Sequence, residues 1–158
     1  MLLDKERNMR PYTVSLFGHR KIHDLKMIEE KLSSIISNIL REHENVEFLI
    51  GRQGEFDEYA ASIIKRELKN YEMCNATLVL VLPYMVADIE YYEKYYGDII
   101  VPECVSCVHP KAAAFEKNKY MINSSNLVVA YVNEKGGAYK ALQYAIKEGK
   151  ETVNIAIE

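Results

Sequence analysis

Residues 46–57 begin with Val46-Glu47-Phe48-Leu49-Ile50 and continue with Gly51-Arg52-Gln53-Gly54-Glu55-Phe56-Asp57. The first five residues are a short apolar run typical of a buried strand, and the glycines that follow indicate a loop. Apolar residues then recur at helical spacing from about Phe56 to Tyr71. A strand, a glycine loop and a helix in this order predict one unit of a parallel α/β sheet.

The same order occurs near both ends of the chain. The two further units are Tyr12-Thr13-Val14-Ser15-Leu16-Phe17 before Gly18-His19-Arg20, and Leu127-Val128-Val129-Ala130-Tyr131-Val132 before Asn133-Glu134-Lys135-Gly136-Gly137-Ala138. Apolar spacing predicts a helix from Asp24, as its N-cap, to His43. Another helix is predicted from Ala138 to Lys147, with Gly149 just beyond its end.

Two more strands complete the predicted sheet. The unbroken apolar run Ala76–Leu82, which ends at Pro83, indicates a strand covered on both faces, and the second strand is Thr152–Ile157. The sequence therefore predicts a Rossmann-like, doubly wound α/β fold of about five mainly parallel strands with flanking helices. We expect residues 1–158 to form a single domain, with 1–10 as a flexible tail and 83–110 as a tyrosine-rich insert.

Composition restricts the partners and the compartment. The net charge of −3 argues against a domain that holds nucleic acid through its charge. The first residues lack the apolar stretch of a signal peptide, and the longest nearly apolar segment, 76–87, is too short to span a bilayer. We therefore expect a cytoplasmic protein without a membrane partner.

The cysteines do not predict a metal or redox centre. Cys104 and Cys107 are spaced as a CxxC pair, but a structural zinc site needs four ligands and the remaining cysteine, Cys74, is predicted at the other edge of the sheet. Pro110 separates the pair from the next helix, whereas a redox CxxC opens a helix directly. No cofactor and no metal are predicted.

The glycine loops supply the candidate binding site, because parallel strands end at one edge of a sheet and ligands bind there. Glycine lets backbone approach a ligand, and a helix N-terminus offers free N–H groups to an anion. The candidate ligand-binding residues are Gly18, His19, Arg20, Gly51, Arg52, Gly54, Asp57, Gly136 and Gly137. His19 and Arg20 either contact a phosphate or simply cap the end of a strand. Asp57 either recognises a ribose hydroxyl or is there because its carboxylate interacts favourably with the helix dipole.

The insert carries five tyrosines, Tyr84, Tyr91, Tyr92, Tyr95 and Tyr96. Two interpretations remain open. The rings either cover the edge of the sheet or a subunit interface, or they form a lid that stacks on a nucleobase. Their position after the third predicted strand places them at the edge that carries the glycine loops.

Four motifs together resemble the SLOG superfamily, which includes the LOG enzymes and DprA-like DNA-processing domains. They are Gly18-His19-Arg20, Gly51 to Asp57, Lys117-Asn118-Lys119-Tyr120-Met121, and Gly136-Gly137-Ala138-Tyr139-Lys140-Ala141. The resemblance covers about Tyr12 to Ile157 and is closest to the small stand-alone branch of the superfamily. It implies a Rossmann-like domain whose glycine loops bind a nucleotide or a nucleotide-derived ligand, often as a dimer.

The departures from the LOG pattern concern catalysis. Gln143 stands where the LOG loop has its catalytic glutamate, and Lys117 falls at the catalytic arginine. A glutamine side chain cannot transfer a proton as a carboxylate does, and lysine lacks the planar fork of arginine. Phosphoribohydrolase activity by the LOG mechanism is therefore not expected, and no catalytic residue is assigned.

The function predicted first is a soluble binding or sensor domain for a nucleotide or nucleotide-derived ligand, acting as a homodimer. The alternative is a hydrolase or transferase acting on a nucleotide or nucleoside phosphate, with Asp57, Glu55 or Glu134 as general base. A third is a DNA-processing accessory domain, which the acidic pI of about 5.9 disfavours.

Overall fold

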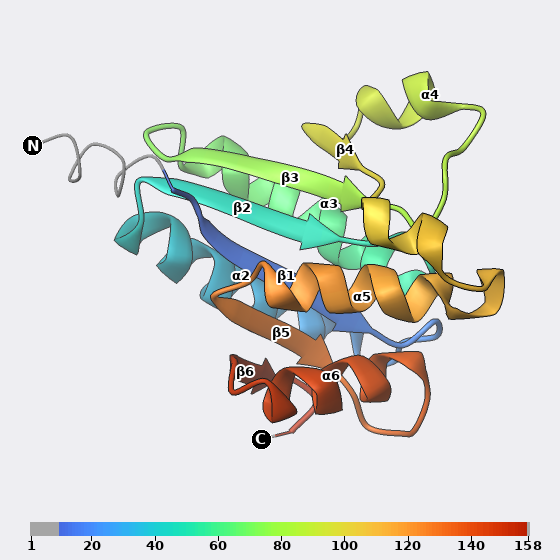
Figure 1. The fold of residues 1–158 in the computed structure, drawn as a ribbon. Helices are drawn as coiled ribbons and strands as arrows, with labels where there is room; N and C mark the ends of the chain where they lie inside the picture. Colours follow the sequence, from blue (N-terminus) through green and yellow to red (C-terminus); the bar gives the residue numbers. More distant parts are fainter. Residues whose placement is uncertain (1–9, 158) are drawn as a thin grey trace, which may run out of the picture.

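A single parallel sheet forms the centre of the computed structural model, which describes residues 10–157. The predicted tail therefore lies, apart from Arg10, outside the described residues. The sheet has six strands in the order β4-β3-β2-β1-β5-β6 (Figure 1). The strands are β1 Tyr12–Gly18, β2 Asn45–Ile50, β3 Asn75–Val81, β4 Asp98–Ile100, β5 Leu127–Tyr131 and β6 Glu151–Asn154. Every neighbouring pair is parallel, which confirms the predicted α/β fold class.

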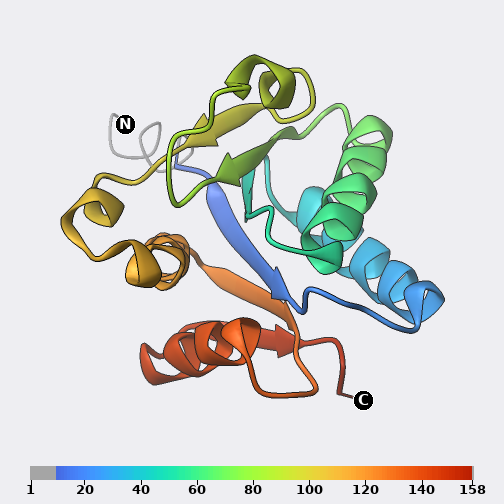
Figure 2. The same ribbon diagram turned by 90° about the vertical axis from the view of Figure 1, so that its right-hand side faces the viewer.

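Helices cover both faces of the sheet (Figures 1 and 2). Helices α2 Leu25–Glu42 and α3 Glu55–Asn70 pack on one face, and α5 Ala113–Asn123 and α6 Gly137–Lys147 on the other. The short α4 Ile89–Glu93 and the 3-10 turns η1 Glu103–Cys107 and η2 Pro110–Ala112 belong to the segment between β3 and α5. Successive residues of a strand point to opposite faces, so β3 packs Leu78 and Leu80 on the α2–α3 side and Val79 and Val81 on the other.

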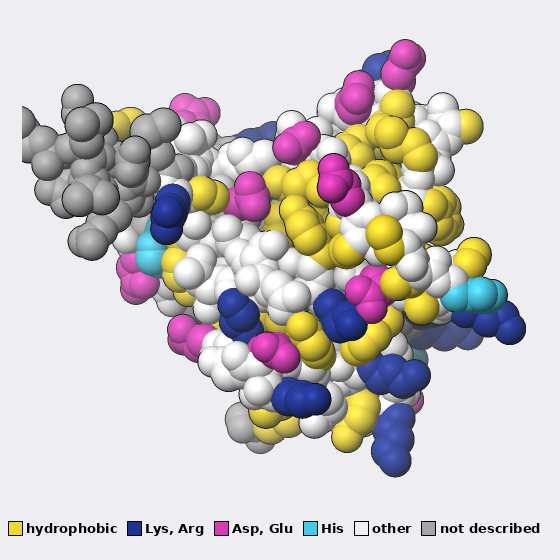
Figure 3. All heavy atoms as spheres, viewed as in Figure 1, with side chains coloured by type: hydrophobic (Ala, Val, Ile, Leu, Met, Phe, Trp, Pro, Cys, Tyr) yellow, Lys and Arg dark blue, Asp and Glu magenta, His cyan; other side chains and the backbone are white. Residues whose placement is uncertain are grey.

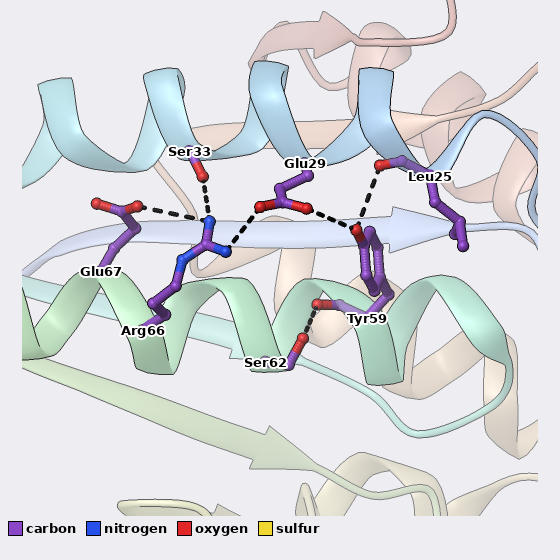
Figure 4. Close-up of polar contacts among 7 residues, drawn as sticks. All are labelled: Leu25, Glu29, Ser33, Tyr59, Ser62, Arg66 and Glu67. Atoms are coloured by element: carbon purple, nitrogen blue, oxygen red, sulfur yellow. Dashed lines mark hydrogen bonds and ion pairs between the residues drawn. The ribbon is translucent and has the colours of Figure 1, made fainter.

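Exposed polar contacts join α2 to α3 (Figure 4). The Arg66 guanidinium lies 2.8 Å from a carboxylate oxygen of Glu29 and donates to the Ser33 hydroxyl, and the Tyr59 hydroxyl donates to the other oxygen of Glu29. Arg66 lowers the pKa of the Glu29 carboxyl. Exposed pairs of this kind contribute roughly 0–1 kcal/mol each, so they set the register of two helices that the core already holds together.

The sixth strand is the main difference from the sequence prediction. Only three residues long, β4 lies inside the predicted insert and pairs with β3. Gly97 makes this approach possible, because a Cβ there would lie 2.7 Å from Thr77 Cγ2. A strand this short leaves no periodic signal in the sequence, and its pairing depends on the neighbouring strand.

Helix and strand ends agree with the sequence in one place and differ in two. After α6, Gly149 has φ 73°, and Gly149 N–H and Lys150 N–H donate to Ile146 and Ala145, which is the predicted glycine-terminated end. Asp24 precedes α2 as predicted, but its backbone is left-handed and its side chain makes no capping hydrogen bond. The strand predicted to reach Ile157 ends at Asn154 instead.

Candidate functional site

The three glycine loops meet around one cavity at the carboxyl ends of β1, β2 and β5, the edge that faces the viewer in Figure 2. The cavity has a volume of about 580 Å³. Its polar and charged lining consists of His19, Arg20, Lys21, Gln53, Asp57, Lys111, Lys117, Asn118, Glu134, Lys135 and Lys140, together with Gly18, Gly51, Gly136 and Gly137. The volume suits a small organic ligand.

His19 joins the loop after β1 to the loop after β5. Its Nε2 atom accepts a hydrogen bond of 3.0 Å from the Asn133 N–H, and its ring meets Tyr131 edge-on. An Nε2 atom that accepts a hydrogen bond carries no proton, so the neutral imidazole holds its proton on Nδ1. His19 is only 8% exposed. Its hydrogen bond to Asn133 holds the two loops together, and its side chain also lines the cavity.

Two of the predicted glycines are required by packing between the first two loops. A Cβ on Gly18 would lie 2.1 Å from Phe56 Cγ, and one on Gly54 would lie 2.4 Å from Arg20 Cα. The Glu55 N–H also donates to the Arg20 carbonyl at 2.8 Å. Gly18 and Gly54 thus let the loop after β1 lie directly against the start of α3.

Gly51 has a different neighbour, the Lys117 ammonium. A Cβ on Gly51 would lie 2.6 Å from Lys117 Nζ and 3.2 Å from Asp57 Oδ2. Lys117 comes from α5 and Asp57 from α3, so helices from the two faces of the sheet bring opposite charges to the end of β2. Gly51 leaves the space in which these two groups face the cavity.

Both charges are buried. Lys117 is 2% exposed and Asp57 is 9% exposed. Burial lowers the pKa of Lys117, although Asp57 opposes this shift. Burial raises the pKa of the Asp57 carboxyl. This increase is partly offset by the Gln53 N–H, which donates to Oδ2 at 3.0 Å, and by the charge of Lys117. Burial thus shifts the pKa values of both groups away from their ordinary values and toward neutrality.

Asn118 adds an unpartnered polar group beside them. Its side chain is 7% exposed and lines the cavity, and its Oδ1 atom is buried without a hydrogen-bond partner among residues 10–157. A buried acceptor left unpaired costs roughly 1–3 kcal/mol. A ligand group that donates a hydrogen bond would satisfy it.

The N-terminus of α6 opens onto the cavity. Gly136 and Gly137 line it, and in the described part of the chain no atom lies within 4 Å of a Cβ built on either. The first turn of α6 contains no acidic residue, and Gly136 supplies no side-chain cap. The free N–H groups of this turn are thus available to an anion.

Positive charge predominates around this opening. Six cationic side chains line the cavity, Arg20, Lys21, Lys111, Lys117, Lys135 and Lys140, against the carboxylates of Asp57 and Glu134. Figure 3 shows Lys and Arg side chains gathered at the right-hand end of the molecule, where α5 and α6 begin. An acidic protein has thus concentrated positive charge at one edge of its sheet.

Two of the predicted site residues do not line this cavity. Arg52 points toward the tyrosine insert, where its guanidinium lies 4.8 Å from the centre of the Tyr92 ring. Gly54 is covered by Arg20. Of the proposed general bases, Glu55 accepts from the Ile22 N–H, whereas Asp57 and Glu134 line the cavity. Gln143 is exposed on α6 and lies outside the cavity lining.

Sequence reasoning missed Asn118 and the lysine rim, and it treated Lys117 only as a poor match to an arginine. A signal was present in α5. Its buried positions are Ala113, Lys117, Asn118, Met121 and Ile122, so Lys117 and Asn118 occupy the core-facing side of an amphipathic helix. Polar residues at such positions are rarely buried without a partner or a ligand.

The insert covers the β4 edge of the sheet. Tyr96 is 4% exposed, and Tyr92 packs against the main core, whereas Tyr84 and Tyr91 are each 65% exposed. Hydrophobic side chains gather around α4 and β4 in Figure 3. The predicted homodimer stays a prediction, for which these exposed rings offer contact surface.

The cysteines of the described chain are unpaired, with Cys104 and Cys107 exposed on η1 and Cys74 before β3. Within residues 10–157, no group of three or more His, Cys, Asp or Glu side chains is arranged to hold a metal ion. None of the helices described is long and apolar enough to cross a membrane.

Solved structures provide the matches to this chain; no protein-family model and no curated protein matches it. One is the Moco carrier protein of Chlamydomonas rheinhardtii, with a TM-score of 0.56 and 18% identity over 92% of this chain and 76% of that one. Another is described as the molybdenum cofactor carrier protein MCP from Chlamydomonas reinhardtii, with a TM-score of 0.55, 19% identity and the same coverage. What is shared is the fold.

Proposed function

We propose that this protein binds a phosphate-bearing small molecule, a nucleotide or a nucleotide-derived ligand, and acts as a carrier or sensor of it. The observation that carries the proposal is the N-terminus of α6, which opens without an acidic residue onto a cavity lined by six cationic side chains. Free N–H groups, the helix dipole and surrounding ammonium groups all favour a phosphate.

The floor of the cavity supplies the remaining recognition. Lys117 gives a buried charge for the anionic part of the ligand, and the unpaired Asn118 Oδ1 accepts a hydrogen bond from a hydroxyl or amino group. Asp57 is placed to accept from a ribose hydroxyl. A phosphorylated sugar attached to a base contains all of these groups.

The similar structures support a binding role through their fold. They are described as carriers of the molybdenum cofactor. We include that cofactor among the ligands to be tested, beside nucleotides. Membership of the SLOG superfamily remains our proposal and rests on the four motifs.

The enzymatic alternative has one observation in its favour. The raised pKa of the buried Asp57 carboxyl, close to Lys117, suits proton transfer. A reaction on a nucleotide or nucleoside phosphate would use Asp57 or Glu134 as its base, because both line the cavity whereas Glu55 accepts from the Ile22 N–H.

Calorimetry with matched ligands and matched lysines tests the proposal. The panel consists of nucleoside mono-, di- and triphosphates, cyclic nucleotides, ADP-ribose and the molybdenum cofactor, each nucleotide paired with its unphosphorylated nucleoside. Lys117→Met should weaken binding of the phosphorylated member by about 1.5–3 kcal/mol, the scale of a charged hydrogen bond. Lys119→Met is the control, because Lys119 lies on the same helix and pairs with Glu116 at 2.8 Å.

A phosphorylated ligand should bind the wild type and the Lys119→Met variant equally, and the unphosphorylated nucleoside should bind far more weakly. The proposal is wrong if nucleoside and nucleotide bind alike, or if both lysine variants keep the full affinity.

A further inference from the structure

A second cavity lies on the other side of the loop after β2. It has a volume of about 410 Å³ and is lined by Arg52, Glu58, Tyr91, Tyr92, Lys94, Tyr95 and Tyr96. Gly51 and Gln53 line the first cavity, whereas Arg52 between them lines the second. The start of α3 is divided in the same way, with Asp57 in the first and Glu58 in the second.

The aromatic wall of this cavity is held in place. Tyr96 and Tyr92 pack against the main core, and Tyr95 meets Tyr96 edge-on at 5.0 Å. From α3, the Lys65 ammonium lies 3.7 Å from the centre of the Tyr95 ring. Attractions of this type contribute roughly 0.5–1 kcal/mol at exposed sites. The rings are therefore positioned before any ligand arrives.

Tyr96 is hydrogen-bonded to Arg52, but within the described chain the other tyrosine hydroxyls of the cavity are unused. Elsewhere the hydroxyls of Tyr59, Tyr131 and Tyr144 donate hydrogen bonds. In residues 10–157, no such bond of 3.5 Å or less is made by the hydroxyls of Tyr91, Tyr92 and Tyr95. These hydroxyls can therefore bind a ligand without first breaking a bond within the protein.

Arg52 gives the cavity its charge preference. Its guanidinium lies against the Tyr92 ring at 4.8 Å, and its ion pair with Glu58 is long, 3.8 Å. Desolvation lowers the pKa of Arg52, but the hydrogen bond with Tyr96 and the charges of Tyr92 and Glu58 outweigh it and raise the pKa. With Lys94, the cavity has two cations against the single carboxylate of Glu58. A guanidinium oriented by a ring and weakly paired is suited to bind an anionic group.

We propose that this tyrosine cavity is a separate binding site for a small planar aromatic ring that carries an anionic group. The ring stacks on the tyrosine wall and the anion meets Arg52 and Lys94. This inference does not depend on the function proposed for the first cavity, because no residue lines both.

Fluorescence titration with indole-3-carboxylate tests the site, since the chain contains no tryptophan and excitation beyond the tyrosine absorption band excites the probe alone. Two competing molecules, whose binding is measured by calorimetry because indole itself fluoresces, separate the requirements: indole has the ring without the charge, and cyclohexanecarboxylate has the charge without the ring. Both should bind at least about tenfold more weakly than indole-3-carboxylate, because each lacks one of the two attractions.

Variants locate the binding. Arg52→Ala should weaken the probe at least about tenfold, since it removes the charge and the stacked guanidinium together. Arg66→Ala, which removes an exposed arginine of α3 outside this cavity, and Lys117→Met in the first cavity should leave the affinity for the probe unchanged. Arg52 is itself exposed, so its removal should not unfold the protein.

The inference is overturned if Arg52→Ala binds the probe as tightly as the wild type, or if indole or cyclohexanecarboxylate competes as strongly as indole-3-carboxylate. Loss of probe binding in Lys117→Met would also overturn it, because the probe would then occupy the first cavity. Failure of nucleotides to bind the protein, with the probe results as expected, would count against the proposed function alone.

Discussion

Helices α3 and α6 both have a glycine as N-cap and both follow a parallel strand, yet the residues of their first turns differ in charge and packing. The first turn of α3 contains the acids Glu55, Asp57 and Glu58, and the loop before it is packed against the backbone of Arg20. The first turn of α6 contains no acid, and the glycines before and within it face open space. One glycine loop is closed by packing within the protein, and the other is the loop for which we propose an anion site.

The difference shows that glycine has two uses at strand ends. Where the end of β1 meets the loop after β2 and the start of α3, absent side chains let the backbone pack closely, with Gly54 against Arg20 and Gly18 against Phe56. In the loop after β5, it leaves room for something outside the chain. The acids that follow Gly54 already satisfy the dipole of α3, so a phosphate there would meet repulsion.

Alanine substitution of one glycine of each kind should give the largest difference in stability between two variants. Gly18→Ala places a Cβ where Phe56 Cγ lies 2.1 Å away, so the free energy of unfolding should fall by about 2–3 kcal/mol. Gly137→Ala meets no described atom within 4 Å and should leave stability within about 0.5 kcal/mol while it weakens phosphate binding. Urea unfolding and calorimetry of both variants measure this. Equal losses of stability would remove the distinction between the loops.

The carboxyl group of Asp57 should make stability depend on pH. Its pKa is raised in the folded protein above the ordinary value of 3.8, so folded chains bind more protons than unfolded ones between these two values. Its contribution is therefore complete below the unfolded pKa and is lost as pH rises through the folded pKa.

Asp57→Asn removes that titration and provides the comparison. The stability of the wild type minus that of the variant should decrease as pH rises above about 4, by about 1.4 kcal/mol for each unit of pKa difference. Urea unfolding at a series of pH values measures the difference. A difference that stays constant, or that increases with pH, contradicts the burial of an ionisable carboxyl at this site.

Arg20 should have a smaller effect on binding than the buried Lys117. The side chain is exposed, so Arg20→Ala should weaken binding of a phosphorylated ligand by only about 0.5–1 kcal/mol.

Gln143→Ala should leave the affinity for a phosphorylated ligand unchanged, since Gln143 lies outside the cavity lining. Wild-type protein incubated with nucleoside monophosphates should release no free base. Base release that stops in Gln143→Ala would restore the LOG mechanism.

The sequence predicts the strand and helix units well because their signals are local. Apolar runs ending in glycine loops locate β1, β2 and β5, and Gly149 marks the end of α6. The strand β4 could not be predicted, since its three residues form a strand only beside β3. The residues at the floor of the cavity could not be predicted for a related reason. Lys117 and Asp57 are brought together by helices on opposite faces, and no local pattern encodes such a contact.

Backbone amide NMR during a titration with inorganic phosphate tests the contrast between the two helix starts most directly. The amides of Gly137, Ala138 and Tyr139 should shift strongly and saturably, because their N–H groups are the free donors of α6. Those of Glu55 and Phe56 should stay nearly still, since they already donate to Arg20 and His19. Shifts centred on the first turn of α3, or no saturable shift in the first turn of α6, would contradict the assignment of the α6 N-terminus as the anion site.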